Sequence, residues 1–165
     1  MSTTADLIGR LMDREGGFSN DPTDPGGATC WGITRATLAA YRQKAVTVDE
    51  VKQLSRIEAG AIYQTIYLGR YKIGQLPDSF IEQLLDFAVN SGPLIAIQAF
   101  QEILGVTADA VIGPQTIATA LIAPAAATST KLMKWRIMMF ARICRRDPSQ
   151  LKFLGGWLAR ALIFA

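Results

Sequence analysis

Residues 14–34 read REGGFSNDPTDPGGATCWGIT, and this stretch decides where the first helix ends and how the chain turns after it. The segment before it has apolar residues at helical spacing and a threonine that can cap a helix. The apolar positions are Leu7, Ile8, Leu11 and Met12, and the candidate caps are Thr3 and Thr4. Gly16 and Gly17 end this predicted helix. The Asp-Pro and Gly-Gly pairs after them predict a small β-hairpin or ordered loop within residues 18–34.

Glu15 is an unexpected residue for the last turn of a helix. A step of about 100° per residue places it within the apolar arc, so its carboxylate is directed toward the interior. The negative end of the helix dipole disfavours another negative charge there by roughly 0.3–1 kcal/mol. Partial burial and the dipole both favour the protonated form, which a general acid needs near neutral pH. A glutamate held by Arg14 or another buried partner is the alternative.

The composition is that of a globular protein. The chain has 165 residues, of which 50% are hydrophobic and 19% charged, enough for one compact core that can be built from two lobes. No apolar run reaches the roughly 18 residues that span a bilayer, and the N-terminus lacks a signal-peptide pattern. We therefore expect a soluble protein made in the cytoplasm.

Cys30 and Cys144 are expected to be reduced thiols, with a disulfide between them as the alternative.

The sequence contains no histidine, which narrows the possible chemistry. Ser-His-Asp and Cys-His systems need an imidazole, and most hydrolytic zinc sites use at least one histidine ligand. A hydrolase of this composition would use carboxylates, one protonating a leaving group and another activating water or stabilising positive charge. We expect no metal and no cofactor.

The loop after Glu15 supplies candidates for the other groups of such a site. Asp24 lies nine residues after Glu15 and Thr29 lies fourteen after it, so a loop folding back over the helix end would bring a carboxylate and a hydroxyl to it. Asp-Pro pairs are also ordinary turn formers; this interpretation is preferred for Asp21, and both stay open for Asp24. Trp31 is equally suited to the core and to stacking on a sugar.

Nearly everything after residue 34 has helical signals, so we expect a mainly α-helical fold. Caps or capping boxes are predicted at Thr34, Thr47 with Glu50, and Ser55 with Glu58, and Pro77, Gly92, Gly105 and Pro114 mark helix ends. The stretch PAAATST, residues 124–130, is the most linker-like segment, and a basic helix comes after it.

Positive charge is concentrated at the C-terminal end. Residues 131–165 hold eight Lys and Arg against one acid, whereas residues 1–130 hold nine against thirteen. Such an end attracts a polyanion such as a cell-wall polymer, a membrane surface or a nucleic acid. A solvated helix face is the alternative, and both can hold.

These motifs resemble glycoside hydrolase family 108, within the lysozyme-like superfamily. Its pattern of Glu-Gly-Gly, an aromatic, Asp-Pro-x-Asp-Pro-Gly-Gly and Gly-Ile-Thr is matched by EGGF, DPTDPGG and WGIT, and LLDFAVNSGP is similar to its second signature. The segment AIQAFQEILGVTADAVIGPQT is similar to a helical peptidoglycan-binding segment. The resemblance implies a lysozyme-like helical fold, with residues 1–92 as the catalytic half and 93–165 as the binding half, packed as one globular unit.

The resemblance implies an N-acetylmuramidase that hydrolyses the β-1,4 bond between N-acetylmuramic acid and N-acetylglucosamine. Glu15 matches the catalytic glutamate, Asp24 would activate water or stabilise charge, and Thr29 would position water. Candidates for substrate contact are Trp31, Thr34, Asp86 and Asn90, of which Thr34 and Asn90 are also suited to capping helices.

The expected partner is peptidoglycan, without nucleic acid, and the basic C-terminal helix can add contact to an anionic wall polymer. We expect a monomer, exported through a phage holin, as an endolysin is, or by a specialised secretion system. A non-catalytic wall-binding or secretion-accessory protein is the alternative function.

Overall fold

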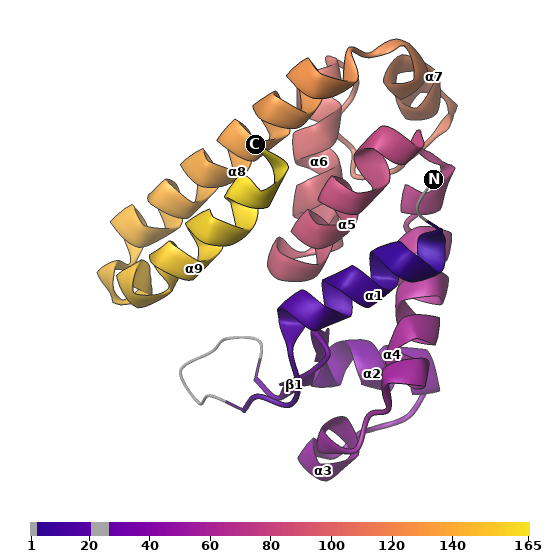
Figure 1. The fold of residues 1–165 in the computed structure, drawn as a ribbon, viewed down its shortest axis with the longest axis vertical. Coiled ribbons are helices and arrows are strands. Elements are labelled where there is room, and N and C mark those ends of the chain that lie inside the picture. The colour runs from indigo at the N-terminus through magenta and orange to yellow at the C-terminus, as the bar shows by residue number, and fades with distance from the viewer. Residues whose placement is uncertain (1–2, 21–26) are drawn as a thin grey trace. The chain divides into compact units, whose positions relative to one another are not determined.

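The computed structural model describes residues 3–20 and 27–165. The described chain has nine α-helices and one two-stranded antiparallel sheet, so the predicted mainly α, lysozyme-like fold is confirmed (Figure 1). It divides into two compact units, the N-terminal unit of residues 1–74 and the C-terminal unit of residues 75–165.

The first helix has the predicted limits. Helix α1 spans Thr4–Glu15 and is capped by Thr3, whose side chain accepts a hydrogen bond from the Asp6 backbone while the Asp6 carboxylate accepts one from the Thr3 backbone. Gly16 ends the helix with φ of 74°, and its N–H donates to the Met12 carbonyl. A residue without a Cβ adopts this conformation readily, which explains why the helix stops directly after Glu15.

The rest of the N-terminal unit consists of the hairpin and short helices. Its elements are β1 (Thr29–Cys30), β2 (Ile33–Thr34), α2 (Arg35–Arg42), α3 (Val48–Lys52), α4 (Arg56–Ile62) and a π-helix, η1 (Tyr63–Arg70). The predicted caps at Thr34, Thr47 and Ser55 are confirmed. The π-helix was not predicted, because nothing in its local sequence distinguishes it from a continuation of α4. Such segments are rare and often occur at functional sites.

Helix α1 packs on α4, and Arg56 holds the two together. Its guanidinium pairs with Asp13 at 2.7 Å and donates to the Gly9 carbonyl at 3.2 Å. The buried core of this unit includes Ile8, Leu11, Met12, Ile33, Leu38, Val51, Ile62 and Tyr63. The Arg56 contacts fix the second half of α1 on α4.

The C-terminal unit is built from longer helices. They are α5 (Asp78–Ser91), α6 (Pro93–Leu104), α7 (Pro114–Ile122), α8 (Ala125–Arg146) and α9 (Leu151–Ala161). The 3₁₀ turn η2 (Ile73–Gln75) lies at the boundary between the two units. Two further 3₁₀ turns, η3 (Pro148–Gln150) and η4 (Leu162–Phe164), flank α9. The predicted breaks at Pro77 and Gly92, the cap at Gly105 and the start at Pro114 are confirmed. Helices α5 and α6 pack together, with Phe80 and Phe100 in ring contact in the core.

The predicted linker at residues 124–130 is wrong. Pro124 caps α8, and the alanines and threonines after it form the first turns of a 22-residue helix. Proline is tolerated at a helix start and alanine is the strongest helix former, so the stretch continues into the basic helix. Helix α9 lies along α8, and Phe140 stacks on Trp157 with ring centroids 5.1 Å apart (Figure 1).

No helix in residues 3–20 and 27–165 is long and apolar enough to span a bilayer. Cys30 and Cys144 are both buried free thiols, as expected.

Candidate active site

Glu15 lies at the C-terminal end of α1 and is half-buried. Its position depends on the hairpin that comes after it in the chain. Strand β1 pairs with β2 through Cys30 and Ile33, and a two-residue turn of Trp31 and Gly32 joins them. Both turn residues have positive φ, 53° and 74°, as a type I′ turn requires.

The turn brings its backbone directly against Glu15. A Cβ atom added to Gly32 would lie 2.5 Å from Glu15 Cγ and 2.8 Å from Cδ, closer than any side chain tolerates. Glycine is therefore required here for two reasons, its positive φ and the space that the glutamate side chain occupies. The carboxyl stem of Glu15 is packed against the tip of the hairpin.

Tyr63 fixes this turn from the other side. Its hydroxyl donates a 2.7 Å hydrogen bond to the Trp31 carbonyl, and the same oxygen would lie 2.5 Å from a Cβ on Gly32. Trp31 is held further by its indole N–H, which donates to the Leu54 carbonyl at 3.1 Å, and by Arg56, whose guanidinium lies 5.4 Å from the indole ring centroid. These contacts hold an unusual tryptophan in a left-handed conformation, so Trp31 has an architectural role whether or not it also contacts a sugar.

Tyr67 is the second buried phenol near the glutamate. Burial raises the pKa of Tyr67 to about 12, a hydrogen bond with Thr37 opposes that rise, and the charges of Tyr71 and Glu15 add to it. Its ring packs 5.4 Å from Tyr63 and 6.3 Å from Tyr71. Tyr67 is therefore neutral under ordinary assay conditions and close enough to Glu15 to respond to its charge.

The predicted residues of the loop differ in how they are placed. Thr29 is half-buried in β1, and its backbone pairs with Ser19. Thr34 uses its hydroxyl to cap α2, accepting from the Thr37 backbone and bonding the Thr37 hydroxyl at 3.0 Å. Asp24 and Asp21 lie outside the described residues. The hairpin reaches the end of α1 through Gly32, which contacts Glu15. Roles for Thr29, Trp31 and Thr34 in the site stay predictions.

Asp86 and Asn90 belong to the C-terminal unit and form a different arrangement. Asp86 is fully buried, accepts from Arg136 at 2.7 Å and is paired with Arg160 at 2.9 Å. Asn90 Oδ1 accepts from the Arg136 guanidinium at 3.1 Å. These contacts give Asp86 a structural role that links α5 to α8 and α9, and its contact with substrate stays a prediction.

Arg136 is a buried charged side chain that the sequence analysis did not single out. It lies on a buried stripe of α8, with Leu132, Phe140 and Cys144 at spacings of four, and it is only 2% exposed. The same spacing of four separates Asp86 from Asn90 on α5. The sequence carries a signal for this cluster. An arginine stands within the apolar stripe of one helix, and an acid and an amide stand at the same spacing on another.

The family model for glycosyl hydrolase 108 matches residues 8–92. The chain belongs to this family. A second model, described as a predicted peptidoglycan domain, matches residues 95–162. Among solved structures, the chain is similar to SagA of Brucella abortus, with 33% identity, a TM-score of 0.79, and coverage of 97% of this chain and 94% of that one. No curated protein matches.

The glycosyl hydrolase 108 family membership confirms the predicted family and makes the chain a glycoside hydrolase that acts on peptidoglycan in the cell wall. The two family models meet near residue 93, whereas the compact units divide after residue 74, because α5 packs on α6. The predicted division after residue 92 stays a prediction.

Proposed function

We propose that this protein is an N-acetylmuramidase that hydrolyses the β-1,4 bond between N-acetylmuramic acid and N-acetylglucosamine, with Glu15 as general acid. The observation that carries the proposal is the placement of Glu15, half-buried at a helix end and packed against the Gly32 turn. A glutamate fixed by backbone contact keeps one orientation, and proton transfer to a leaving oxygen depends on orientation.

In the proposed reaction Glu15 donates its proton to the glycosidic oxygen as the bond to the anomeric carbon breaks. The positive charge that develops on the sugar is stabilised by a second carboxylate, or water attacks while that carboxylate accepts its proton. Asp24 is our candidate for this carboxylate, and Thr29 for positioning the water. Asp24→Asn should then cost far more activity than Asp21→Asn at equal thermal stability, and equal, mild losses would contradict the assignment.

Replacing Glu15 tests the main proposal. Glu15→Gln should lose about 10²–10⁴-fold in lysis of isolated peptidoglycan, followed by turbidity, because the amide cannot donate the required proton. Glu102→Gln is the matched control, since Glu102 is an exposed glutamate whose carboxylate only accepts from the Trp135 indole. Wild-type lysis by a folded Glu15→Gln protein would remove Glu15 from the mechanism. No lysis by the wild-type protein would favour the non-catalytic wall-binding or secretion-accessory alternative.

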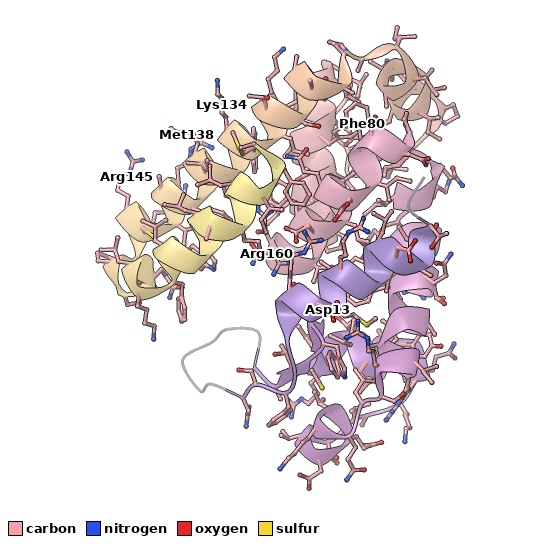
Figure 2. The ribbon with its side chains drawn as sticks, viewed as in Figure 1. Asp13, Phe80, Lys134, Met138, Arg145 and Arg160 are labelled. Carbon is pink, nitrogen blue, oxygen red and sulfur yellow. The ribbon has the colours of Figure 1, made fainter. Side chains whose placement is uncertain are left out.

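We also propose that the C-terminal helices add electrostatic attachment to an anionic wall polymer. Six of the eight cations in residues 131–165 are exposed, whereas Arg136 is buried and Arg160 largely so, both engaged by Asp86. Figure 2 shows Lys134 and Arg145 along one edge of α8. Changing Lys131, Lys134, Arg145 and Arg146 to glutamine should weaken wall binding and its salt dependence, with little effect on a short soluble oligomer.

A further inference from the structure

The C-terminal unit contains a partly open cavity of about 140 Å³ that no step of the proposed reaction uses. It lies where α5, α6, α8 and α9 meet, and its walls are Asn90, Ser91, Ile95, Met139, Phe140, Ile143 and Trp157. Pockets that hold whole ligands usually enclose about 300–1,000 Å³. This one is large enough for a single substituent of a larger molecule.

Its lining defines the chemistry of that substituent. The seven described residues that line the cavity are all uncharged, and five of them are apolar or aromatic. Trp157 is held between Phe140 and Phe153, with ring centroids 5.1 and 5.9 Å away, so the aromatic wall is rigid. A neutral group with an apolar end suits this lining, and a carboxylate or ammonium would lose its hydration without compensation.

Asn90 supplies one oriented polar group. Arg136 has only donors, so the amide oxygen of Asn90 must face it, and the Ser91 hydroxyl donates to the same oxygen at 3.1 Å. Arg136 is itself fixed by Asp86 at 2.7 Å. The amide nitrogen of Asn90 is therefore the group left to face a ligand, and it donates. The cavity combines a hydrogen-bond donor at its wall with an apolar interior.

We infer that this cavity binds the acetamido group of an N-acetylated sugar, with the methyl among the apolar side chains and the carbonyl accepting from Asn90. The inference rests on the proposed function, whose substrate carries such a group on every sugar. Alanine in the wall peptide also joins a methyl to an amide, so the peptide is the competing occupant that the experiment must distinguish.

The test uses the Glu15→Gln protein, so that ligands are not cleaved, and soluble glycan strands freed of peptide. Binding is measured by calorimetry to the N-acetylated strands, to strands re-acylated with formyl groups, and to the isolated peptide. The formyl strand should bind about fourfold more weakly, because one buried methyl is missing. Equal binding to both strands, or binding to the peptide alone, would overturn the inference.

Paired variants connect the effect to this cavity. Ile95→Trp fills the opening from an exposed position and should weaken binding more than tenfold, whereas Leu94→Trp, exposed beside it but outside the lining, should change it less than twofold. Asn90→Asp keeps the acceptor for Arg136 but removes the donor, and should weaken binding about three- to tenfold. Unchanged binding by folded Ile95→Trp would exclude the cavity.

The proposed function has its own readout. If the wild-type protein does not clear peptidoglycan, the enzymatic proposal fails regardless of these binding results. If it does clear peptidoglycan but binding ignores the acyl group, only the acetamido assignment fails.

Discussion

Glu15 in the N-terminal unit and Asp86 in the C-terminal unit are both carboxylates on the inward side of a helix, yet their surroundings differ. Asp86 is 0% exposed and is held by Arg136 and Arg160. Glu15 is half-buried, and the atoms of its stem pack against the backbone of a turn.

The difference lies in burial and in charged partners. A fully buried carboxylate needs cationic partners, because desolvation of its charge costs several kcal/mol. A half-buried glutamate whose stem packs against backbone is restricted in orientation. One of its carboxylate oxygens, Glu15 Oε1, is itself buried. Exposure and the kind of contact, rather than residue type, therefore distinguish the two positions.

The largest expected effect on stability is at Asp86. Asp86→Asn should lower the free energy of unfolding by about 3–5 kcal/mol in urea titrations, because two arginines lose the charge that they were buried with. The exposed Asp78→Asn is the control, with an expected change within about 0.5 kcal/mol. The double variant Asp86→Leu with Arg136→Met should lose less stability than the single variants Asp86→Leu and Arg136→Met lose in sum. Additive losses would mean that the cluster is not a coupled unit.

The largest effect on activity short of Glu15 itself is expected at Gly32. Gly32→Ala should cost about 2–4 kcal/mol of stability, from positive φ and from overlap with Glu15 and Tyr63, and should lower turnover about 100-fold or more. Gly105→Ala has nearly the same φ, 72°, with no atom near the added Cβ, so it isolates the backbone cost. Equal turnover in these two variants would show that the turn does not position Glu15.

Tyr67 gives an effect of intermediate size that depends on pH. Its pKa is raised from 10.0 to about 12 in the folded protein, so between these values the unfolded chain releases the proton and the folded one keeps it. The neutral phenol therefore contributes stability that is fully present below pH 10 and is lost as the pH rises toward 12. This loss amounts to about 2–3 kcal/mol of the free energy of unfolding. Tyr67→Phe should remove this part of the alkaline decline, measured by urea unfolding at stepped pH, whereas Tyr41→Phe should keep it.

The smallest effect on stability is expected at Tyr63. Tyr63→Phe removes the hydrogen bond to the Trp31 carbonyl and should cost about 1 kcal/mol. If Tyr63 positions Glu15 through the turn, kcat on a soluble muropeptide oligomer should fall about tenfold while KM changes little. A lower melting temperature with unchanged kcat would restrict Tyr63 to a structural role.

Sequence alone determined the features that depend on a few neighbouring residues. The caps at Thr34, Thr47 and Ser55 and the helix end after Glu15 result from local hydrogen bonding and from the conformations open to glycine. The structure decided between Thr3 and Thr4 as the first cap, and between a hairpin and an ordered loop within residues 18–34. The family resemblance came from the same stretch, because the residues around Glu15 are contiguous.

Only the tertiary structure decided which side chains these elements bring together. Tyr63 lies 32 residues from Trp31, and Arg136 and Arg160 lie 50 and 74 residues from Asp86, so no local pattern fixes these partners. The contact of Gly32 with Glu15 joins a turn to a helix end across the loop between them. Local propensities choose the elements, whereas burial of apolar faces and neutralisation of buried charge choose the pairings. The candidate Glu15 therefore came from contiguous residues, whereas the contacts of Gly32, Tyr63 and Arg136 follow only from the fold.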